Sequence, residues 1–249
     1  MLLLKGLEKY IGQLLEISNY RDYCPNGVQV EGRPEIRTIV SGVSASLDVL
    51  QAASAAGADA VLVHHGYFWK NEEPRITGVK RARIAHLMEH GMSLLAYHLP
   101  LDAHPALGNN AQLAQLLGFQ AEGYFGEQNI AAVGRLLQPM SLQRLGGVVG
   151  EKLRRQPLVV GEEGAIIRRI AWCSGAAQDY LAAAIELGVD AFLTGEVSEQ
   201  TVHLARESGV AFISAGHHAT ERYGVQALGA HLAQQFGIKH QFIEVENPV

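Results

Sequence analysis

The sequence has few cysteines and no long hydrophobic run. Only two cysteines, Cys24 and Cys173, occur among 249 residues, and they do not form a C-x-x-C pair. This argues against a disulfide framework and a cysteine-based zinc site, and it favours a reducing, cytoplasmic location. No apolar run approaches the roughly 20 residues that a membrane-spanning helix needs. The apolar stretch at Met1–Leu4 is too short for a secretory signal and precedes its charge, Lys5. We therefore expect no membrane partner.

Charge is also scarce. Charged residues make up 18% of the chain, with 20 basic and 25 acidic side chains and a formal net charge of −5. This balance argues against a wholly basic nucleic-acid-binding surface. The basic residues are dispersed in short pairs such as Arg154-Arg155 and Arg168-Arg169, which are typical of solvated surface. Hydrophobic residues make up 48%, which excludes disorder and suffices for one large or two modest domains.

Helical and strand patterns alternate along the chain. Apolar residues at helical spacing between Leu4 and Leu15 predict an N-terminal amphipathic helix. Residues 38–43 have the pattern of a buried strand, 47–56 that of a helix closed by Gly57, and 58–63 that of a second strand. This alternation predicts an α/β fold with helices packed on the faces of a sheet.

The second half of the chain repeats this order. The segment Gly188–Leu193 matches Gly57–Leu62, 131 residues earlier. We therefore predict two similar interlinked α/β halves, residues 1–124 and 169–249, related by a pseudo-twofold. Residues 125–168, richer in glycine and short apolar strands, are expected to form a small inserted segment. The alternative is that this similarity is the ordinary likeness of all α/β sequences.

The positions of the histidines point to a functional site, because several of the eleven histidines directly follow predicted strands. Seven imidazole or carboxylate side chains lie at or just beyond three such strand ends: His64, His65, His98, Asp102, His217, His218 and Glu221. In open parallel sheets, ligands bind outside the carboxyl ends of the strands, so these side chains are expected at one crevice. Imidazole and carboxylate together suit Zn, Mn, Fe, Co or Ni.

The spacing of these residues favours two metal ions. Adjacent strand residues point to opposite faces, so His64 and His65 cannot address one ion unless the strand has ended. On a helix, Glu221 can share a face with His217 or His218. The four positive charges of two divalent ions exceed the two negative charges of Asp102 and Glu221. This excess favours binding of hydroxide or of an anionic substrate. The alternative is that the His-His pairs are ordinary hydrogen-bonding residues at strand ends.

Six motifs carry a resemblance to a known family: Pro25–Val30, Gly57–Gly66, His98–Asp102, Gly108–Asn110, Leu193–Glu196 and Gly216–Glu221. They resemble the Nif-three-like proteins, also called the GTP cyclohydrolase 1 type 2 family, and are closest to its short bacterial members. The resemblance implies a dinuclear metal centre ligated by His64, His65, Asp102, His217 and Glu221, with Glu221 bridging. It also implies a toroidal homohexamer, a trimer of dimers whose metal sites face the interior.

The family name implies a hydrolase that opens the guanine imidazole ring of GTP and releases formate. In that interpretation a metal-bound hydroxide attacks a nucleotide or a related anionic small molecule, and His98 or His218 is the proton carrier by position. The sequence contains no G-x-x-x-x-G-K-[ST] loop for nucleotide phosphates. The segment Gly108–Asn110 is expected to cap a helix over 111–117, with anion binding as the alternative.

Two further functions stay open. One is a metal-binding ring protein that acts on damaged nucleotides or nucleic acid in a radiation or DNA-damage response, as suggested for similar bacterial proteins. The other is a non-catalytic metal-binding regulatory scaffold. Nucleic acid is the less expected partner, because its binding relies on clustered basic residues that neutralise phosphates.

Overall fold

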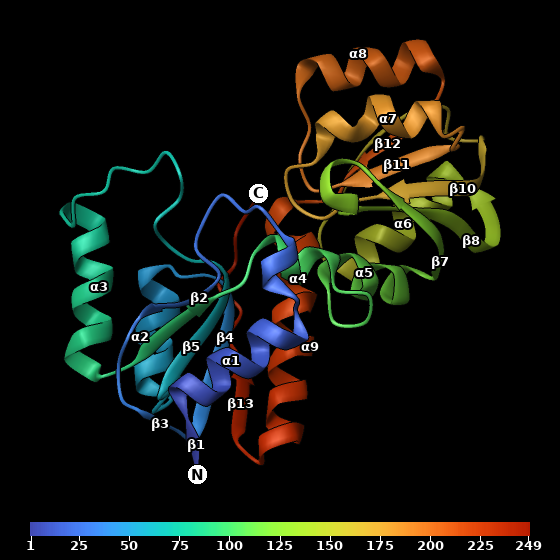
Figure 1. The fold of residues 1–249 in the computed structure, drawn as a ribbon. Coiled ribbons are helices and arrows are strands. Elements are labelled where there is room, and N and C mark those ends of the chain that lie inside the picture. Colours follow the sequence, from blue (N-terminus) through green and yellow to red (C-terminus); the bar gives the residue numbers. More distant parts are fainter. The chain divides into compact units, whose positions relative to one another are not determined.

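The computed structural model describes residues 1–249 and divides them into two compact units (Figure 1). The first comprises Met1–Leu101 and Gly224–Glu246, and the second comprises Asp102–Tyr223 and Asn247–Val249. The chain passes from one unit to the other within helix α4 (Leu99–Ala103), again within helix α9 (His217–Phe236), and a third time after Glu246. None of the helices combines the length and the apolar character needed to cross a membrane.

The first unit is built on a five-stranded sheet in the order β13-β4-β5-β6-β2. Its strands are β2 (Gly27–Val30), β4 (Thr38–Ser44), β5 (Ala60–His65), β6 (Ser93–Ala96) and β13 (Lys239–Phe242). Only β2 runs antiparallel to its neighbour. Helices α2 (Leu47–Ala55) and α3 (Gly78–His90) cover one face, and α1 (Leu4–Leu14) and the C-terminal part of α9 cover the other (Figure 1). The short strands β1 (Leu2–Leu3) and β3 (Glu35–Ile36) pair with each other, and a 3-10 turn η1 (Ile17–Asn19) follows α1.

Local sequence explains where these elements start and stop. The Ser46 hydroxyl accepts a hydrogen bond from the Val49 N–H and caps the start of α2. Gly91, in the left-handed conformation, ends α3. In the centre of the sheet, Val61 and Leu94 are fully buried, and burial of each such side chain contributes about 1.5–3 kcal/mol. This packed core fixes the positions of the residues that follow β5 and β6.

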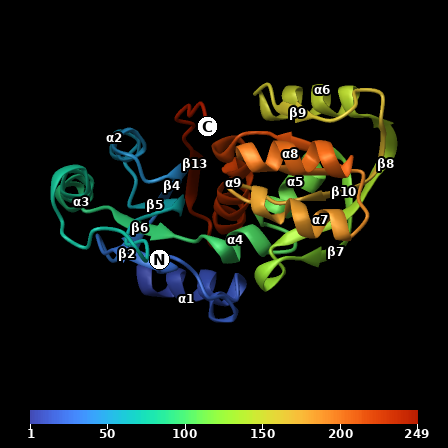
Figure 2. The ribbon, with the colours of Figure 1, turned by 90° about the horizontal axis from the view of Figure 1, so that it is seen from above.

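The second unit is built on a six-stranded sheet in the order β7-β8-β10-β11-β12-β9. Its strands are β7 (Phe119–Phe125), β8 (Ala131–Ser141), β9 (Leu158–Val160), β10 (Ile166–Trp172), β11 (Ala191–Thr194) and β12 (Ala211–Ser214). Strands β10, β11 and β12 are parallel, and the others pair antiparallel. Helices α5 (Asn109–Leu117) and α6 (Leu142–Leu153) pack on one face, and α7 (Leu181–Glu186) and α8 (Glu199–Ser208) lie side by side on the other (Figure 2). Two 3-10 turns, η2 (Glu127–Asn129) and η3 (Gln178–Tyr180), complete the unit.

The predicted α/β fold is confirmed. The helix expected between residues 4 and 15 is α1, and the strand-helix-strand pattern over 38–63 is β4-α2-β5. In the second half the matching segment is β10-α7-β11. Each unit therefore contains three parallel strands joined by helices in the same order, which is the feature that the sequence repeat detects. The pseudo-twofold relation of the halves stays a prediction.

The bounds of the two units differ from the predicted division into 1–124, 125–168 and 169–249. Residues 125–168 share the six-stranded sheet with their neighbours, because β8 pairs with β10 and β9 pairs with β12. Residues 224–246 belong to the first unit, since β13 pairs with β4. Pairing between strands so distant in sequence leaves no local pattern from which the division could be predicted.

Candidate metal centre

Three imidazoles gather at the carboxyl ends of β5 and β6 in the first unit. His64 and His65 are the last residues of β5, and His98 follows β6. The ring centroids of His64 and His65 lie 4.7 Å apart, and those of His64 and His98 lie 5.0 Å apart. One ring nitrogen from each residue lies within 4.8 Å of the other two. The strand-end argument therefore brings together three side chains that could serve one metal site.

His64 and His65 face the same place although they are adjacent in a strand. Strand alternation predicts opposite directions, but both rings approach His98, with centroids at 5.0 and 5.8 Å. The reason is that β5 ends at His65, whose Nδ1 lies 3.0 Å from Ser44 Oγ. The next residue, Gly66, has no room for a Cβ, which would collide with a side chain of β2. The two rings therefore do not point to opposite faces of the strand, which was the orientation that would have required a separate ion for each histidine.

Hydrogen bonds at Nδ1 determine which nitrogen these rings present. His64 Nδ1 lies 3.0 Å from the carbonyl oxygen of Tyr97, and because a carbonyl only accepts, Nδ1 carries the proton. His98 Nδ1 donates to Asp22 Oδ1 at 2.7 Å. In both neutral rings the lone pair is consequently on Nε2. This is the arrangement by which proteins orient metal-ligating histidines.

Asp22 holds His98 in place. Its Oδ2 accepts hydrogen bonds from Asn26 Nδ2 at 2.8 Å and from the Leu99 N–H at 2.9 Å. Burial would raise the pKa of Asp22, but the hydrogen bond and charge of His98, with bonds from Asn26 and the Tyr23 N–H, hold that pKa below its ordinary value. Asp22 is therefore ionised at neutral pH and fixes the orientation of the His98 ring.

Replacing Asp22 with asparagine is expected to weaken metal binding or any activity that uses His98. The variant keeps the size of the side chain but removes the charged acceptor, and loss of such an anchor costs about 10–100-fold in metal affinity or activity. Equilibrium dialysis with Zn²⁺ and a kinetic assay measure the two effects. Asp48→Asn, at an exposed position in the first turn of α2, is the control. Wild-type affinity and activity in Asp22→Asn would contradict the positioning role.

Cys24 forms a further compact group with Asp22 and His98. Burial, aided by the negative charge of Asp22, raises the pKa of the Cys24 thiol to about 12. The thiolate is the form that binds metals, so this neutral thiol is a poor ligand at pH 7. Both cysteines are unpaired, as expected, and the donors of the first unit are nitrogen atoms.

In the second unit, Glu221 lies near both His217 and Asp102. His217 is the first residue of α9 and Glu221 lies one turn later, which places His217 Nε2 3.1 Å from Glu221 Oε2. Carboxylate oxygens of Asp102 and Glu221 lie within 4.8 Å of each other. The two residues are only 5% and 3% exposed. Buried carboxylates this close repel unless a cation or a proton lies near them, so the donor set fits a metal ion.

His217 lies between two carboxylates. Its Nδ1 donates to Glu196 Oε1 at 2.7 Å, while Nε2 faces Glu221. Burial lowers the pKa of His217, but the hydrogen bonds and charges of Glu221 and Glu196 outweigh it and raise the pKa to about 9. The imidazolium proton thus supplies positive charge beside Glu221, in the place where a bound cation would supply it.

Asp102 is fixed by neutral donors from two elements. Asn109 Nδ2 and Ser174 Oγ each donate to Asp102 Oδ1 at 2.9 Å. Asn110 Oδ1 accepts from the Ser174 N–H at 2.9 Å, and its Nδ2 donates to the Ile130 carbonyl at 2.9 Å. The two asparagines begin α5, but their side chains hold this network, and the start of the helix has no side-chain cap. Gly108, the first residue of the predicted capping segment, is the N-cap residue of α5, and the helix begins at Asn109 rather than at Ala111.

Two glycines allow the backbone to approach His217 and Glu221. Gly175, at a φ of +69°, lies so near Glu221 that an added Cβ would overlap Oε1. At Gly195, an added Cβ would lie 2.6 Å from the Cα of His217. The Gly175 N–H also donates to Thr220 Oγ1 at 3.0 Å. The loops after β10 and β11 are consequently packed against the start of α9, and only glycine fits at these two positions.

The remaining candidate, His218, makes a different contact. Its backbone N–H donates to the Val249 carbonyl at 3.0 Å, and the residue is half-buried. Its role as a proton carrier stays a prediction. Histidines outside the candidate set have other partners, and His86 Nε2, for example, lies 3.0 Å from Ser54 Oγ.

Sequence reasoning assigned no role to Asp22, Ser174 or Glu196. Ser174 and Glu196 follow β10 and β11, so the strand-end rule that found His64 could have found them too. Asp22 lies in a loop before β2 and contacts a residue 76 positions later. No periodicity or motif spacing indicates such a contact.

The whole chain is similar in sequence to proteins of one known family. A family model described as Duf34/NIF3 (NGG1p interacting factor 3) matches residues 2–248. The chain belongs to the Duf34/NIF3 family. A Pseudomonas aeruginosa protein named GTP cyclohydrolase 1 type 2 homolog is 56% identical over 248 residues, with 98% of each chain covered. A Neisseria meningitidis protein of the same name is 50% identical over 248 residues, with 100% of each chain covered.

Solved structures share the Duf34/NIF3 fold over the whole chain. Protein ybgI, described as of unknown function, has a TM-score of 0.96 and 46% identity, with 100% of both chains covered. TTHA1606 from Thermus thermophilus has a TM-score of 0.90 and 31% identity, also with 100% of both chains covered. The family resemblance predicted from the six motifs is confirmed.

Proposed function

We propose that this Duf34/NIF3 protein is a hydrolase with a dinuclear metal centre. The proposed ligands are His64, His65, Asp102, His217 and Glu221, with Glu221 bridging the two ions. The observation that carries the proposal is the anchoring of ring nitrogens: His64 Nδ1 donates to a carbonyl and His217 Nδ1 to a carboxylate, so that Nε2 is the donor atom towards a metal. The names of the relatives, GTP cyclohydrolase 1 type 2 homolog, support hydrolysis as the reaction class.

The donor set suits Zn, Mn, Fe, Co or Ni, because it combines imidazole nitrogen with carboxylate oxygen and contains no thiolate. When bound, two divalent ions supply Lewis acidity and lower the pKa of water. Asp102 and Glu221 contribute two negative charges, whereas the two divalent ions would contribute four positive charges. The excess favours an anionic substrate, such as a nucleotide or a related phosphate-bearing small molecule.

His98 is proposed as the proton carrier, with His218 as the alternative. Because Asp22 accepts from His98 Nδ1, proton exchange with a substrate or water would take place at Nε2. Asp22 keeps the orientation of the His98 ring. This carboxylate behind the ring is the reason for placing His98 before His218.

Substrate turnover by the metal-loaded protein tests the proposal. A panel of nucleotides and phosphoesters, with formate release as the sign of imidazole ring opening, is expected to contain a substrate. His98→Gln should then lower kcat by about 10²–10⁴-fold, the contribution of a general acid or base, and metal analysis of the same protein separates loss of proton transfer from loss of metal. His203→Gln, on the exposed side of α8, is the matched control. Two bound metals without turnover of any substrate would contradict the hydrolase and favour the regulatory scaffold.

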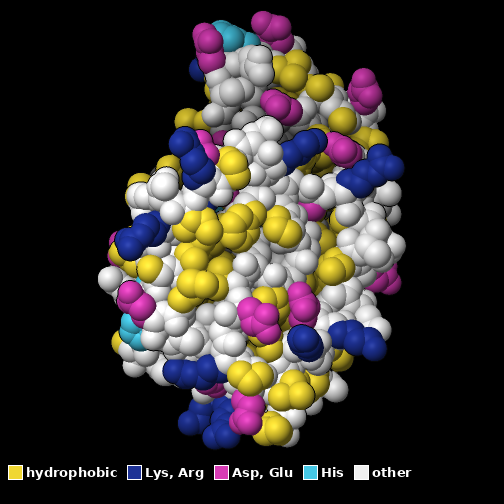
Figure 3. Space-filling model, turned by 60° about the vertical axis from the view of Figure 1, so that its left-hand side comes forward, with side chains coloured by type: hydrophobic (Ala, Val, Ile, Leu, Met, Phe, Trp, Pro, Cys, Tyr) yellow, Lys and Arg dark blue, Asp and Glu magenta, His cyan; other side chains and the backbone are white.

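The proposed assembly is a toroidal homohexamer, a trimer of dimers, located in the cytoplasm. Analytical ultracentrifugation of the purified chain tests the hexamer, and a monomer would contradict it. A role on damaged nucleotides or nucleic acid is the second candidate. On the face shown in Figure 3, Lys and Arg side chains are interspersed with Asp and Glu, which supports a small anionic substrate over a nucleic-acid strand.

A further inference from the structure

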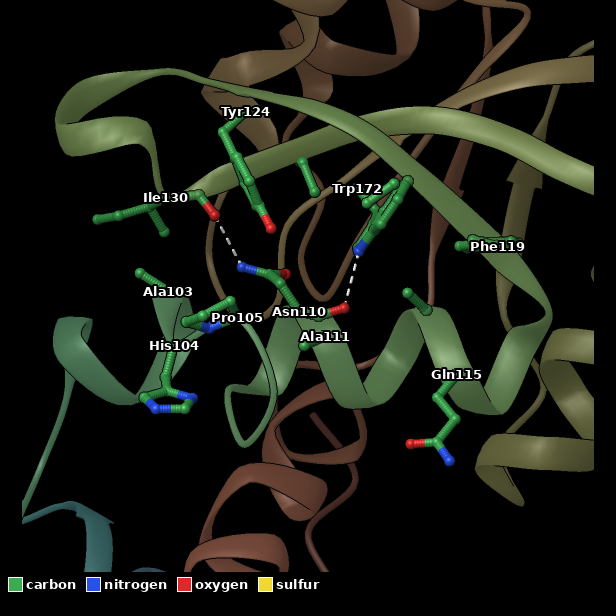
Figure 4. A pocket seen from close by; sticks show the side chains of 13 residues that line it. Ala103, His104, Pro105, Asn110, Ala111, Gln115, Phe119, Tyr124, Ile130 and Trp172 are labelled. Carbon is green, nitrogen blue, oxygen red and sulfur yellow. Dashed lines mark hydrogen bonds between the residues drawn. The ribbon is translucent and has the colours of Figure 1, made fainter. Parts of the chain in front are cut away.

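A cavity of about 250 Å³ lies wholly within the second unit (Figure 4). Helix α5 forms one wall, and β7 and the start of β8 form the opposite wall. Three aromatic side chains, Phe119, Tyr124 and Trp172, contribute to the lining. On the α5 side the lining includes Ala111 and Ala114, whose small side chains leave the space open. The cavity is therefore a slot between aromatic rings and a helix surface of small residues.

The lining residues exclude a charged occupant. None of them is Lys, Arg, Asp or Glu. A charged group that entered would lose its hydration without gaining a counter-charge, which is costly. Aromatic walls instead favour a planar ring, which gains stacking contacts worth about 0.5–1.5 kcal/mol per ring pair beyond burial. The volume is below the roughly 300–1,000 Å³ of sites for drug-sized ligands, so it matches a single ring system.

Hydrogen bonds keep the walls of the slot in place. Trp172 Nε1 donates to the Asn110 carbonyl at 3.0 Å, which fixes the indole against α5. Phe119 packs on Trp172 with ring centroids 5.3 Å apart. Tyr124, 51% exposed, lies at the other end of the slot with its hydroxyl turned towards α5 (Figure 4). These contacts hold the walls of the slot in position, and a site with fixed walls loses less conformational freedom on binding.

One polar side chain of the lining turns towards the slot. Tyr124 points its hydroxyl towards α5, whereas the imidazole of His104 and the amide of Gln115 point away from the space between α5 and Tyr124 (Figure 4). His104 Nδ1 instead accepts from the Leu107 N–H at 2.9 Å and from the Ala106 N–H at 3.2 Å. A single hydroxyl matches the edge of a neutral ring better than an ionic group.

We propose that this slot binds the neutral planar aromatic ring of a ligand, one ring or two fused rings in size. The site is separate from the proposed metal ligands and does not depend on the proposed hydrolase activity. It adjoins one of those ligands, since Asn110 in its wall accepts from Ser174, which donates to Asp102.

Trp172 fluorescence tests the proposal directly. The chain has two tryptophans, and the other, Trp69, belongs to the first unit, so Trp69→Phe leaves Trp172 as the reporter. Full-length Trp69→Phe protein, treated with EDTA, is titrated with guanosine, adenosine and benzyl alcohol. At least one probe is expected to change the emission saturably, with a Kd of about 0.1–1 mM for a ligand of this size. Saturation by a nucleoside identifies a nucleobase site, and saturation by benzyl alcohol alone identifies an apolar-ring site.

Two variants that place a larger side chain in the slot are expected to block binding of the ring. Ala111→Leu fills the slot from α5 at little cost in helix propensity, and Ala121→Leu narrows it from an exposed position on β7. Each is expected to weaken binding at least tenfold. Ala182→Leu, exposed on α7 and outside the slot, is the matched control and should bind like the parent. A linear response to all three probes would overturn the proposal, as would unchanged affinity in a folded blocked variant.

Discussion

Glu221→Ala protein is expected to retain almost none of the two metal ions proposed for the wild type. The Glu221 side chain is buried, contacts His217 at 3.1 Å and lies within 4.8 Å of Asp102. Removing a bridging carboxylate takes a ligand from both ions at once, so both should dissociate on dialysis. Metal analysis of the dialysed protein measures the stoichiometry. Glu199→Ala, which removes a 93% exposed carboxylate from α8, is the control and should keep the wild-type content.

A parallel measurement on His64→Ala distinguishes one shared centre from two separate ions. His64 belongs to the first unit and Glu221 to the second. If Glu221 bridges one dinuclear centre, Glu221→Ala should lose both ions, whereas His64→Ala, which removes a ligand from one ion, should lose less metal. Loss of one ion in each variant, with the other retained, would contradict a shared centre with Glu221 bridging and would leave two mononuclear sites.

Gly175→Ala is expected to lower the free energy of unfolding of the metal-free protein by about 2–4 kcal/mol. Two costs add at this position. A residue with a Cβ pays about 1–2 kcal/mol in the left-handed conformation, and the new methyl group would overlap Glu221 Oε1. Displacement of Glu221 should also reduce metal affinity. Chemical denaturation and equilibrium dialysis measure the two effects.

Gly209→Ala separates these two costs. Gly209 has a φ of +74°, close to the +69° of Gly175, but an added Cβ there meets nothing within 4 Å. This control should lose only the conformational term of about 1–2 kcal/mol and should keep its metal affinity. If both variants lose the same stability and neither loses metal, then the contact between Gly175 and Glu221 does not determine the geometry of the group.

The strand-end argument located the candidate residues because it rests on a local pattern. A buried apolar strand followed by polar residues is visible in sequence at His64-His65 and at His217, and parallel pairing then places such ends at one edge of a sheet. The orientation of His65 was not predictable, because it depends on where β5 stops. That is decided by the packing of Gly66 against β2.

The partners of these residues could not be predicted from sequence. Asp22 contacts His98 through a loop, and Asn110 contacts Ser174 at a separation of 64 residues. Such hydrogen bonds depend on how sheets and helices pack, and no spacing rule encodes them. The same holds for β13, which joins the first sheet from the far end of the chain.

The position of Asn110 links two parts of the second unit. Its backbone carbonyl holds the Trp172 indole in the wall of the slot, and its side chain holds the Ser174 loop, which in turn supports Asp102. Thermodynamic reciprocity then constrains the two sites: if a ring in the slot changes metal affinity by some factor, the metal changes the affinity for the ring by the same factor. Any coupling between occupancy of the slot and occupancy of the metal ligands would therefore act equally in both directions, and Asn110 is the residue that contacts both parts.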